Sequence, residues 1–183
     1  MTITGSPRDA EGRFHAERLA TPSGVAEVLQ RFGLSPLEGR GQSCGVDRNI
    51  LRQIVAAASI RDEDTVIEIG PGLGGLTWAL ADAARTVVAV EVDAGLVRWL
   101  TELMQERDNV HVVHADALQV DLRQLFAEHP PGSGGAYKVA ANLPYYITTP
   151  LLMRFLEENL PVDTMVVMVQ REVAQRMTAR PGT

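Results

Sequence analysis

Short apolar runs and helical patterns alternate along most of the chain. Five runs rich in β-branched and small apolar residues predict strands, at residues 65–69, 86–92, 109–115, 137–141 and 163–169. Between and after these runs, apolar residues recur at helical spacing and predict helices, at residues 73–84, 94–106, 121–128, 148–160 and 171–178. Strands that alternate with helices through short connections form a mostly parallel sheet that is covered on both faces. The pattern therefore predicts an α/β fold.

Local signals indicate where several of the helices begin and end. Thr21-Pro22-Ser23 is expected to cap a helix that runs through Phe32 and is stopped by Gly33. Asp47 is expected to cap a second helix before the first strand. Thr148-Thr149-Pro150 is predicted to begin the helix after the fourth strand, because proline is well suited to the first helical position.

We expect three parts in the chain: residues 1–20, 21–46 and 47–183. The first part is polar and aperiodic, which is typical of a disordered leader. The second holds the first helix and a loop, and the third is the sheet domain. Its fifth strand is apolar throughout Met165-Val166-Val167-Met168-Val169, as in a strand with neighbours on both sides. An apolar edge strand would promote aggregation, so we expect the domain to be truncated after it.

The composition of the chain limits the kinds of partner and the compartment that we expect for it. The net charge is −6, which argues against nonspecific nucleic-acid binding by the chain as a whole, so any RNA site is a local basic patch. Cys44 is the single cysteine, which is consistent with a reducing compartment. No apolar run reaches about 18 residues, and no secretory signal is visible. We expect a cytoplasmic monomer without a membrane segment.

A glycine-rich turn and two acidic residues follow successive predicted strands. Glu68-Ile69-Gly70-Pro71-Gly72-Leu73-Gly74-Gly75 joins the first strand to a helix, and its glycines allow backbone N–H groups to approach a ligand closely. Glu91 ends the second strand, where a carboxylate can accept hydrogen bonds from ribose hydroxyls. Asp116 follows the third strand and can accept one from an adenine amino group. The turn alone suits either a dinucleotide or S-adenosylmethionine.

Asn142-Leu143-Pro144-Tyr145 follows the fourth strand at the same edge of the sheet. Such a turn places a side-chain carbonyl, a backbone carbonyl and an aromatic ring around a small slot, which suits an adenine 6-amino group. Acceptance of both N–H hydrogens, by Asn142 and by the Leu143 carbonyl, would localise the nitrogen lone pair toward a methyl donor. Tyr145 can stack on the base, a contact worth about 1–3 kcal/mol.

These segments resemble the ribosomal RNA small-subunit adenine dimethyltransferases of the KsgA (RsmA) type, in their catalytic domain only. The likeness runs from about Thr21 to Thr183, and its most specific motifs are Val66-Ile67-Glu68-Ile69-Gly70-Pro71-Gly72, Val90-Glu91-Val92-Asp93, Asp116-Ala117 and Asn142-Leu143-Pro144-Tyr145-Tyr146-Ile147-Thr148-Thr149-Pro150. The resemblance implies a Rossmann-like fold and transfer of two methyl groups from S-adenosylmethionine to each of two adjacent adenosines near the 3′ end of small-subunit rRNA, in the immature subunit.

The same resemblance assigns roles to individual residues. It places the methionine end of the cofactor at Gly70 and Gly72, the ribose on Glu91 and the adenine near Asp116. Asn142, with Leu143, Pro144 and Tyr145, would face the target base, and Asn142 would also lie beside the cofactor.

Two departures from the family pattern stand out. Gly41 and Gln42 match a loop that covers the cofactor, and Gln42 is assigned to the cofactor site, but Ser43-Cys44-Gly45 replaces the expected Asn-Phe-Leu. The resemblance also implies two further strands and a C-terminal helical domain with much of the basic RNA surface, and we expect this chain to lack them.

Three alternatives stay open. One is the Erm group of large-subunit rRNA adenine methyltransferases, and another is a noncatalytic RNA-binding or ribosome-assembly factor on the same fold. An NAD-dependent oxidoreductase is the least favoured of the three, because the motif at Asn142 has no role in hydride transfer. We expect no metal site, since His111 and His114 lack clustered ligands and read as sheet residues.

Overall fold

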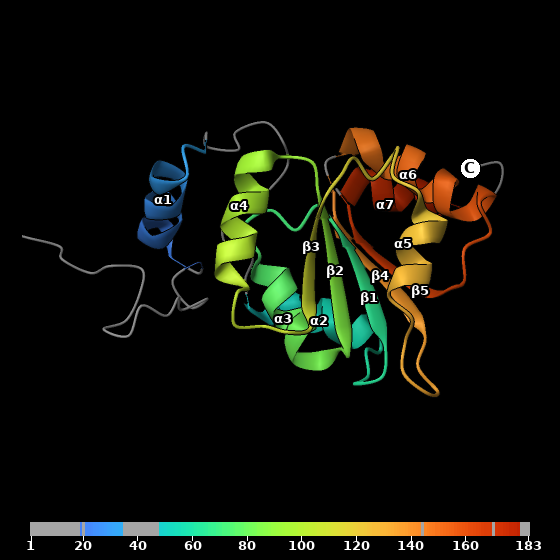
Figure 1. Cartoon of the computed structure of the whole chain (residues 1–183). Coiled ribbons are helices and arrows are strands. Elements are labelled where there is room, and N and C mark those ends of the chain that lie inside the picture. The colour runs from blue at the N-terminus through green and yellow to red at the C-terminus, as the bar shows by residue number, and fades with distance from the viewer. Residues whose placement is uncertain (1–18, 20, 35–47, 144, 170, 180–183) are drawn as a thin grey trace, which may run out of the picture.

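The computed structural model describes residue 19 and residues 21–34, 48–143, 145–169 and 171–179. Five strands form one sheet in the order β3-β2-β1-β4-β5, and every pair of neighbours is parallel (Figure 1). The strands are β1 (Thr65–Ile69), β2 (Thr86–Glu91), β3 (Val110–His114), β4 (Tyr137–Asn142) and β5 (Val162–Met168). The helices are α1 (Pro22–Arg31), α2 (Arg48–Ala57), α3 (Gly75–Ala83), α4 (Ala94–Leu103), α5 (Leu122–Glu128), α6 (Tyr145–Glu157) and α7 (Arg171–Met177).

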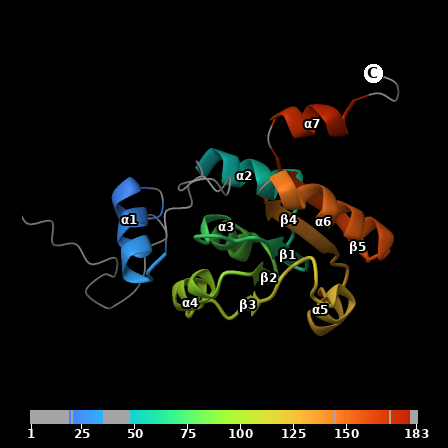
Figure 2. The same cartoon turned by 90° about the horizontal axis from the view of Figure 1, so that it is seen from above.

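Helices pack on both faces of the sheet (Figure 2). On one face, α2 and α3 bury apolar side chains against Val66, Val87 and Ala140, and α4 packs beside them. On the other face, α5 and α6 pack against Ile67 and Val139 of the central strands. Each strand therefore has an apolar surface on both sides, which explains why the strands are nearly continuous apolar runs.

The first helix packs against α4 rather than against the sheet. The rings of Phe32 and Trp99 meet edge to face with their centroids 5.1 Å apart, and Val28 is buried in the same cluster. Arg31 and Glu102 form an ion pair of 3.1 Å at the rim of this contact. The Thr21 hydroxyl accepts a hydrogen bond from the Gly24 N–H at 3.2 Å, which confirms the predicted cap.

The predicted α/β fold and the five strands are confirmed, but the predicted start of α6 is wrong. The helix begins at Tyr145, and Pro150 lies within it rather than at its first position. A proline there cannot donate the usual intrahelical hydrogen bond. Burial of Leu151 and Phe155 against the sheet provides the packing that keeps this segment helical. Residues 1–18, 20 and 35–47 lie outside the described residues, so the predicted leader and loop stay predictions.

A buried lysine also links the neighbouring strands β4 and β5. Lys138 on β4 is 5% exposed, and its ammonium group donates to the carboxylate of Asp163 and to the Thr164 hydroxyl on β5. The hydrogen bonds that Asp163 accepts from Lys138 and from the Thr164 hydroxyl, together with the charge of Lys138, lower the pKa of Asp163 below its ordinary value of 3.8. The carboxylate thereby compensates a charge that is otherwise removed from water.

We predict that Asp163→Asn lowers the thermal unfolding midpoint at pH 7 by a few degrees, because the buried Lys138 ammonium loses its carboxylate. The pKa of Asp163 is lowered in the folded state, so its contribution is present above pH 3.8 and is lost as the pH falls through the folded-state value. Thermal melts over this range should show the two proteins converging in acid. A Lys138→Met, Asp163→Asn double variant should recover stability at pH 7, and its failure to do so would contradict this account.

Candidate functional site

The turn after β1 has the backbone conformation that its glycines predict. Gly70, Gly72 and Gly74 have φ angles of 68°, 57° and 88°, a region that other residues rarely adopt. A Cβ atom on Gly74 would also lie 2.8 Å from the Cδ2 atoms of Leu100 and Leu103, so the turn packs closely on α4. The turn thus leads directly into α3, and its position relative to the sheet is set by both strand and helix.

The turn lies beside the segment that follows β4. A Cβ atom built on Gly70 would be 3.8 Å from the backbone oxygen of Asn142 and 3.6 Å from Cδ2 of Leu143. Asn142 is the last residue of β4 and pairs with Met168, while the Leu143 side chain is 6% exposed and belongs to the core under α5 and α6. The structure therefore brings the predicted base-binding motif next to the glycine turn.

Glu91 connects the glycine turn to the end of β2. Its carboxylate accepts hydrogen bonds from the N–H groups of Val92 and Asp93, both at 2.9 Å, and from the N–H of Gly72 at 3.4 Å. The side chain is 4% exposed, and burial raises its pKa while these backbone hydrogen bonds act in the opposite direction. Glu91 is thus a fixed acceptor beside the turn, and its predicted contact with a ribose stays a prediction.

Asp116 lies beyond β3 at the same edge of the sheet. The Ala115 N–H donates to the Glu91 carbonyl at 3.0 Å, which fixes the end of β3 beside the end of β2. One oxygen of Asp116 accepts from the Leu118 N–H at 2.8 Å and the other from the Gln119 side-chain amide at 3.1 Å. The carboxylate therefore caps its own turn, and its predicted contact with an adenine stays a prediction.

Arg154, which the sequence did not single out, holds this turn from α6. Its guanidinium donates to the Ala117 carbonyl at 2.7 Å and to the Val120 carbonyl, and its Nε donates to Glu158 at 2.6 Å. The helix that begins at the base-binding motif is thereby joined to the turn that carries Asp116. No local sequence pattern predicts this role of Arg154, because only the fold brings it close to the carbonyls of Ala117 and Val120.

Glu68 is a second site residue that the sequence analysis missed, although a carboxylate within a buried strand is a visible signal. It lies two residues before Gly70 in the central strand β1 and is 1% exposed. Burial, which is the largest cause, and the charge of Glu91 together raise its pKa to about 8, while the Thr77 hydroxyl acts in the opposite direction. At pH 7 the Glu68 side chain is therefore protonated and neutral in most molecules.

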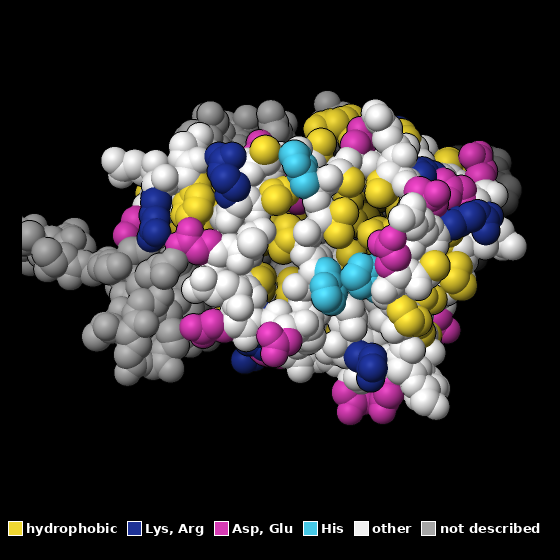
Figure 3. Space-filling view, in the orientation of Figure 1, with side chains coloured by type: hydrophobic (Ala, Val, Ile, Leu, Met, Phe, Trp, Pro, Cys, Tyr) yellow, Lys and Arg dark blue, Asp and Glu magenta, His cyan; other side chains and the backbone are white. Residues whose placement is uncertain are grey.

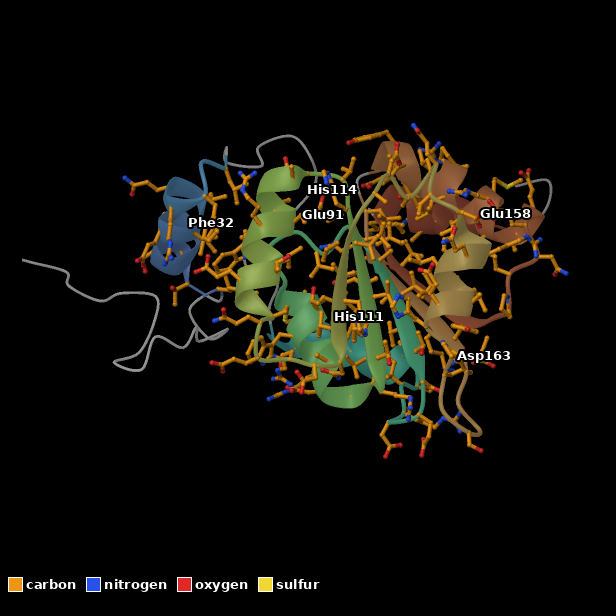
Figure 4. The ribbon with its side chains drawn as sticks, viewed as in Figure 1. Phe32, Glu91, His111, His114, Glu158 and Asp163 are labelled. Carbon is orange, nitrogen blue, oxygen red and sulfur yellow. The ribbon has the colours of Figure 1, made fainter. Side chains whose placement is uncertain are left out.

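The other residues that the sequence analysis discussed form two groups. Some lie outside the described residues, and the histidines lie on or beside the sheet. Gln42, Ser43-Cys44-Gly45 and Pro144 lie outside the described residues, as does the side chain of Tyr145. Figure 4 shows His114 beside Glu91 at the upper edge of the sheet, with His111 lower on β3. His114 Nε2 contacts the Val92 carbonyl at 3.1 Å.

His111 belongs to a ring pair away from the glycine turn. Its ring centroid lies 4.7 Å from that of His129. Figure 3 shows histidine side chains, in cyan, on the face that it presents. The described residues contain no group of three metal-binding side chains. Within the same residues, no helix has the length and apolar character needed to cross a membrane.

Comparison with known proteins gives one consistent family. A family model described as ribosomal RNA adenine dimethylase matches residues 39–183. Ribosomal RNA small subunit methyltransferase A of Alkaliphilus metalliredigens is 46% identical over 167 residues, which are 91% of this chain and 58% of that protein. The protein of the same name from Geobacillus thermodenitrificans is 47% identical over 165 residues, or 90% of this chain and 56% of that protein. The chain thus spans little more than half the length of these relatives.

Solved structures agree with this likeness. The 23S rRNA methyltransferase ErmE has a TM-score of 0.59 and 32% identity, over 73% of this chain and 50% of that chain. A dimethyladenosine transferase from Plasmodium falciparum has a TM-score of 0.61 and 30% identity, over 75% of this chain and 46% of that chain. The sheet is therefore the Rossmann-like sheet of this class of methyltransferases, as predicted.

We predict that Glu68→Gln changes how stability depends on pH. The folded state keeps a proton on Glu68 up to about pH 8, whereas the ordinary pKa is 4.5, so the wild-type protein loses stability as the pH rises between these values. The amide cannot ionise, and the variant should lack this loss. Near pH 4.5, thermal melts should give similar unfolding midpoints for the two proteins. Near pH 8, the midpoint of the variant should be several degrees higher than that of the wild type. Parallel curves would refute the assigned protonation.

Proposed function

Because this chain belongs to the ribosomal RNA adenine dimethylase family, we propose that it carries the cofactor and base sites of an enzyme that transfers methyl groups from S-adenosylmethionine to adenosine 6-amino groups in rRNA. The observation that carries the proposal is the meeting of Gly70, Gly72, Glu91 and Asn142 at one edge of the sheet. In open α/β sheets, ligands bind outside the carboxyl ends of the strands.

The cofactor would be held by the turn and by the two acidic residues. The glycines at 70 and 72 leave the backbone accessible, and the carboxylate of Glu91, which has about four lone-pair sites, keeps about one beyond those used by its three backbone donors. This site can accept a ribose hydroxyl, and Asp116 can accept from the adenine amino group. S-Adenosylmethionine supplies a methyl group that is already activated by its bond to a sulfonium.

The target base would be oriented by the segment after β4. Asn142 ends a hydrogen-bonded strand, and the buried Leu143 side chain anchors the residue whose carbonyl would accept the second amino hydrogen. The backbone that carries both acceptors is therefore fixed before the base arrives, and positioning can supply most of the rate enhancement. Tyr145, at the start of α6, would stack on the base.

The proposed substrate is small-subunit rRNA in an immature subunit, with two adjacent adenosines near the 3′ end as targets. Support comes from the relatives named for small-subunit methylation, which match 90% or more of the chain at 43% identity or above, whereas the Erm enzyme matches 73% at 32%. A cytoplasmic location and a monomeric state are predictions that accompany this substrate. An adenine within a duplex or stack would first have to swing out.

We predict that Asn142→Ala lowers methyl transfer to unmethylated small subunits by about 10²–10³-fold, because it removes one fixed hydrogen-bond partner of the reacting group. Transfer of a labelled methyl group measures this directly. The dissociation constant of S-adenosylhomocysteine should change only a few-fold. His111→Ala, which lies away from the turn, is the matched control and should transfer methyl groups as the unmodified chain does.

Two results would contradict this proposal. Equal incorporation by the Asn142→Ala variant and the unmodified chain would remove the role given to Asn142. Calorimetric binding of NAD without binding of S-adenosylhomocysteine would remove the methyltransferase function as a whole.

We further predict that Arg154→Met weakens S-adenosylhomocysteine binding about three- to tenfold. The substitution removes the hydrogen bonds that hold the carbonyls of Ala117 and Val120, so the turn carrying Asp116 loses its fixed position. Calorimetric titration measures the change, and Arg154→Lys should restore part of the affinity. Arg123→Met is the matched control, since Arg123 contacts the Glu158 carbonyl but not this turn. Equal losses in both variants would show that the effect is not specific to the turn.

A further inference from the structure

Trp99 links the glycine turn to α4, a helix that carries none of the proposed site residues. Its indole is fully buried, and its Nε1–H donates a hydrogen bond of 3.0 Å to the backbone carbonyl of Leu73. Leu73 lies within the turn, between Gly72 and Gly74. A buried indole N–H generally has a hydrogen-bond partner, and here the partner is the backbone of the turn itself.

The Leu73 carbonyl lies outside the hydrogen-bond ladder of α3. The helix begins at Gly75, and its ladder starts with the bond from the Trp78 N–H to the Gly74 carbonyl at 3.0 Å. Gly74 is the N-cap residue and provides no side-chain hydrogen bond. The indole of Trp99 therefore holds a peptide group of the turn that the helix does not hold.

The same peptide group is also held at its N–H. The Gly74 N–H donates to the Pro71 carbonyl at 3.0 Å, within the turn. Because a peptide group is planar, this bond and the indole bond at the Leu73 carbonyl together fix its orientation. The residue before Leu73 is Gly72, whose N–H donates to the Glu91 carboxylate at 3.4 Å. A rotation of the Leu73 carbonyl would therefore displace the part of the turn that is proposed to bind the cofactor.

The N-terminal helix α1 supports the indole. The Phe32 ring packs edge to face on Trp99, and Figure 4 shows Phe32 on the side of α1 that faces α4. Leu34 packs at the start of α4, where a Cβ atom on Gly95 would lie 2.6 Å from the Leu34 Cδ2 atom. The segment from α1 to Leu34 thus contacts α4 at its first turn and at the residue that binds the glycine turn.

We propose that Trp99 is a positioning residue for cofactor binding, and that α1 acts on the glycine turn through the indole N–H of Trp99. This inference rests on the proposed function, which assigns the turn to the methionine end of the cofactor. Because the Trp99 side chain is fully buried, it acts through the Leu73 carbonyl and not by touching the ligand.

A test of this role has to remove the N–H group and keep the shape of the side chain. A smaller residue at position 99 would leave a cavity and lower the stability of the whole domain. Loss of the N–H alone leaves the Leu73 carbonyl without its donor. The expected consequence is weaker binding of the cofactor by the turn, with the core still packed.

The test replaces Trp99 by 3-benzothienylalanine, which has the shape of tryptophan and carries sulfur in place of the N–H. In calorimetric titration of the full chain, the dissociation constant of S-adenosylhomocysteine should rise about three- to tenfold. Tyr137→Phe is the matched control, because it removes another side-chain donor to a backbone carbonyl, that of Phe126, away from the turn. Its dissociation constant should equal that of the unmodified chain.

Amide hydrogen exchange separates a local effect on the turn from a general loss of stability. In the ligand-free protein with benzothienylalanine, the N–H groups of Gly72 and Gly74 should exchange faster than in the unmodified chain. The N–H groups of β1 and β2 should keep their exchange rates, because their opening depends on the stability of the sheet. Faster exchange throughout the sheet would show a merely structural role and overturn the proposal.

A double-variant cycle tests the part played by α1. Phe32→Leu removes the ring that packs on Trp99 and should weaken S-adenosylhomocysteine binding about two- to fivefold in the otherwise unmodified chain. In the protein with benzothienylalanine, the same substitution should cause no further loss, because its effect passes through the missing N–H. Independent losses that multiply in the double variant would overturn the link between α1 and the turn.

The remaining results separate this inference from the proposed function. An unchanged dissociation constant in the protein with benzothienylalanine would overturn the role of Trp99 and leave the methyltransferase proposal intact. An equal loss of affinity in Tyr137→Phe would likewise overturn it, by showing that the effect is not specific to the turn. Failure of S-adenosylhomocysteine to bind to the unmodified chain would contradict the proposed function itself, and the role of Trp99 with it.

Discussion

The hydrogen bonds around the Glu91 carboxylate hold the site together. One side chain joins the end of β2 to the glycine turn after β1, and its three donors are all backbone N–H groups. Backbone donors do not depend on rotamers, so the carboxylate has little freedom once the two segments are in place. These bonds offset part of the cost of burying the charge, and the geometry presented to a ligand is correspondingly rigid.

Fixed acceptors extend from Glu91 along the edge of the sheet. The Asn142 backbone lies against Gly70. Arg154 lies on α6, the helix that begins at the end of the base-binding motif, and it holds the turn with Asp116. The regions proposed to bind the cofactor and the base are therefore held by shared contacts. This arrangement suits a reaction in which the alignment of two bound molecules contributes most of the catalysis.

Local pattern was sufficient to predict the strands and the residues at their ends. Apolar runs bounded by glycine and acidic residues identified β1, β2 and β4, and parallel pairing then brought Gly70, Glu91 and Asn142 to one edge. The start of α6 could not be predicted in the same way, since a proline suited to the first turn lies instead within the helix. Packing of its later residues against the sheet outweighed that local preference.

The roles of Arg154 and Glu68 also depend on contacts between distant segments. An arginine on a helix is usually solvated, and only the fold brings the carbonyls at 117 and 120 within its reach. Glu68 was visible as part of the glycine motif, but its protonation follows from complete burial and from its relation to Glu91, which a linear pattern does not reveal. Gln42, Pro144 and the Tyr145 ring stay predictions from the resemblance.

The order of the strands has a consequence for how the chain assembles during synthesis. β1 is the central strand, yet its second neighbour, β4, is made after β2 and β3. The nascent chain can form only one side of the sheet until Asn142 has left the ribosome, and β1 has an open edge during that interval. Non-local pairing of this kind is slow and exposes apolar surface in partly folded states.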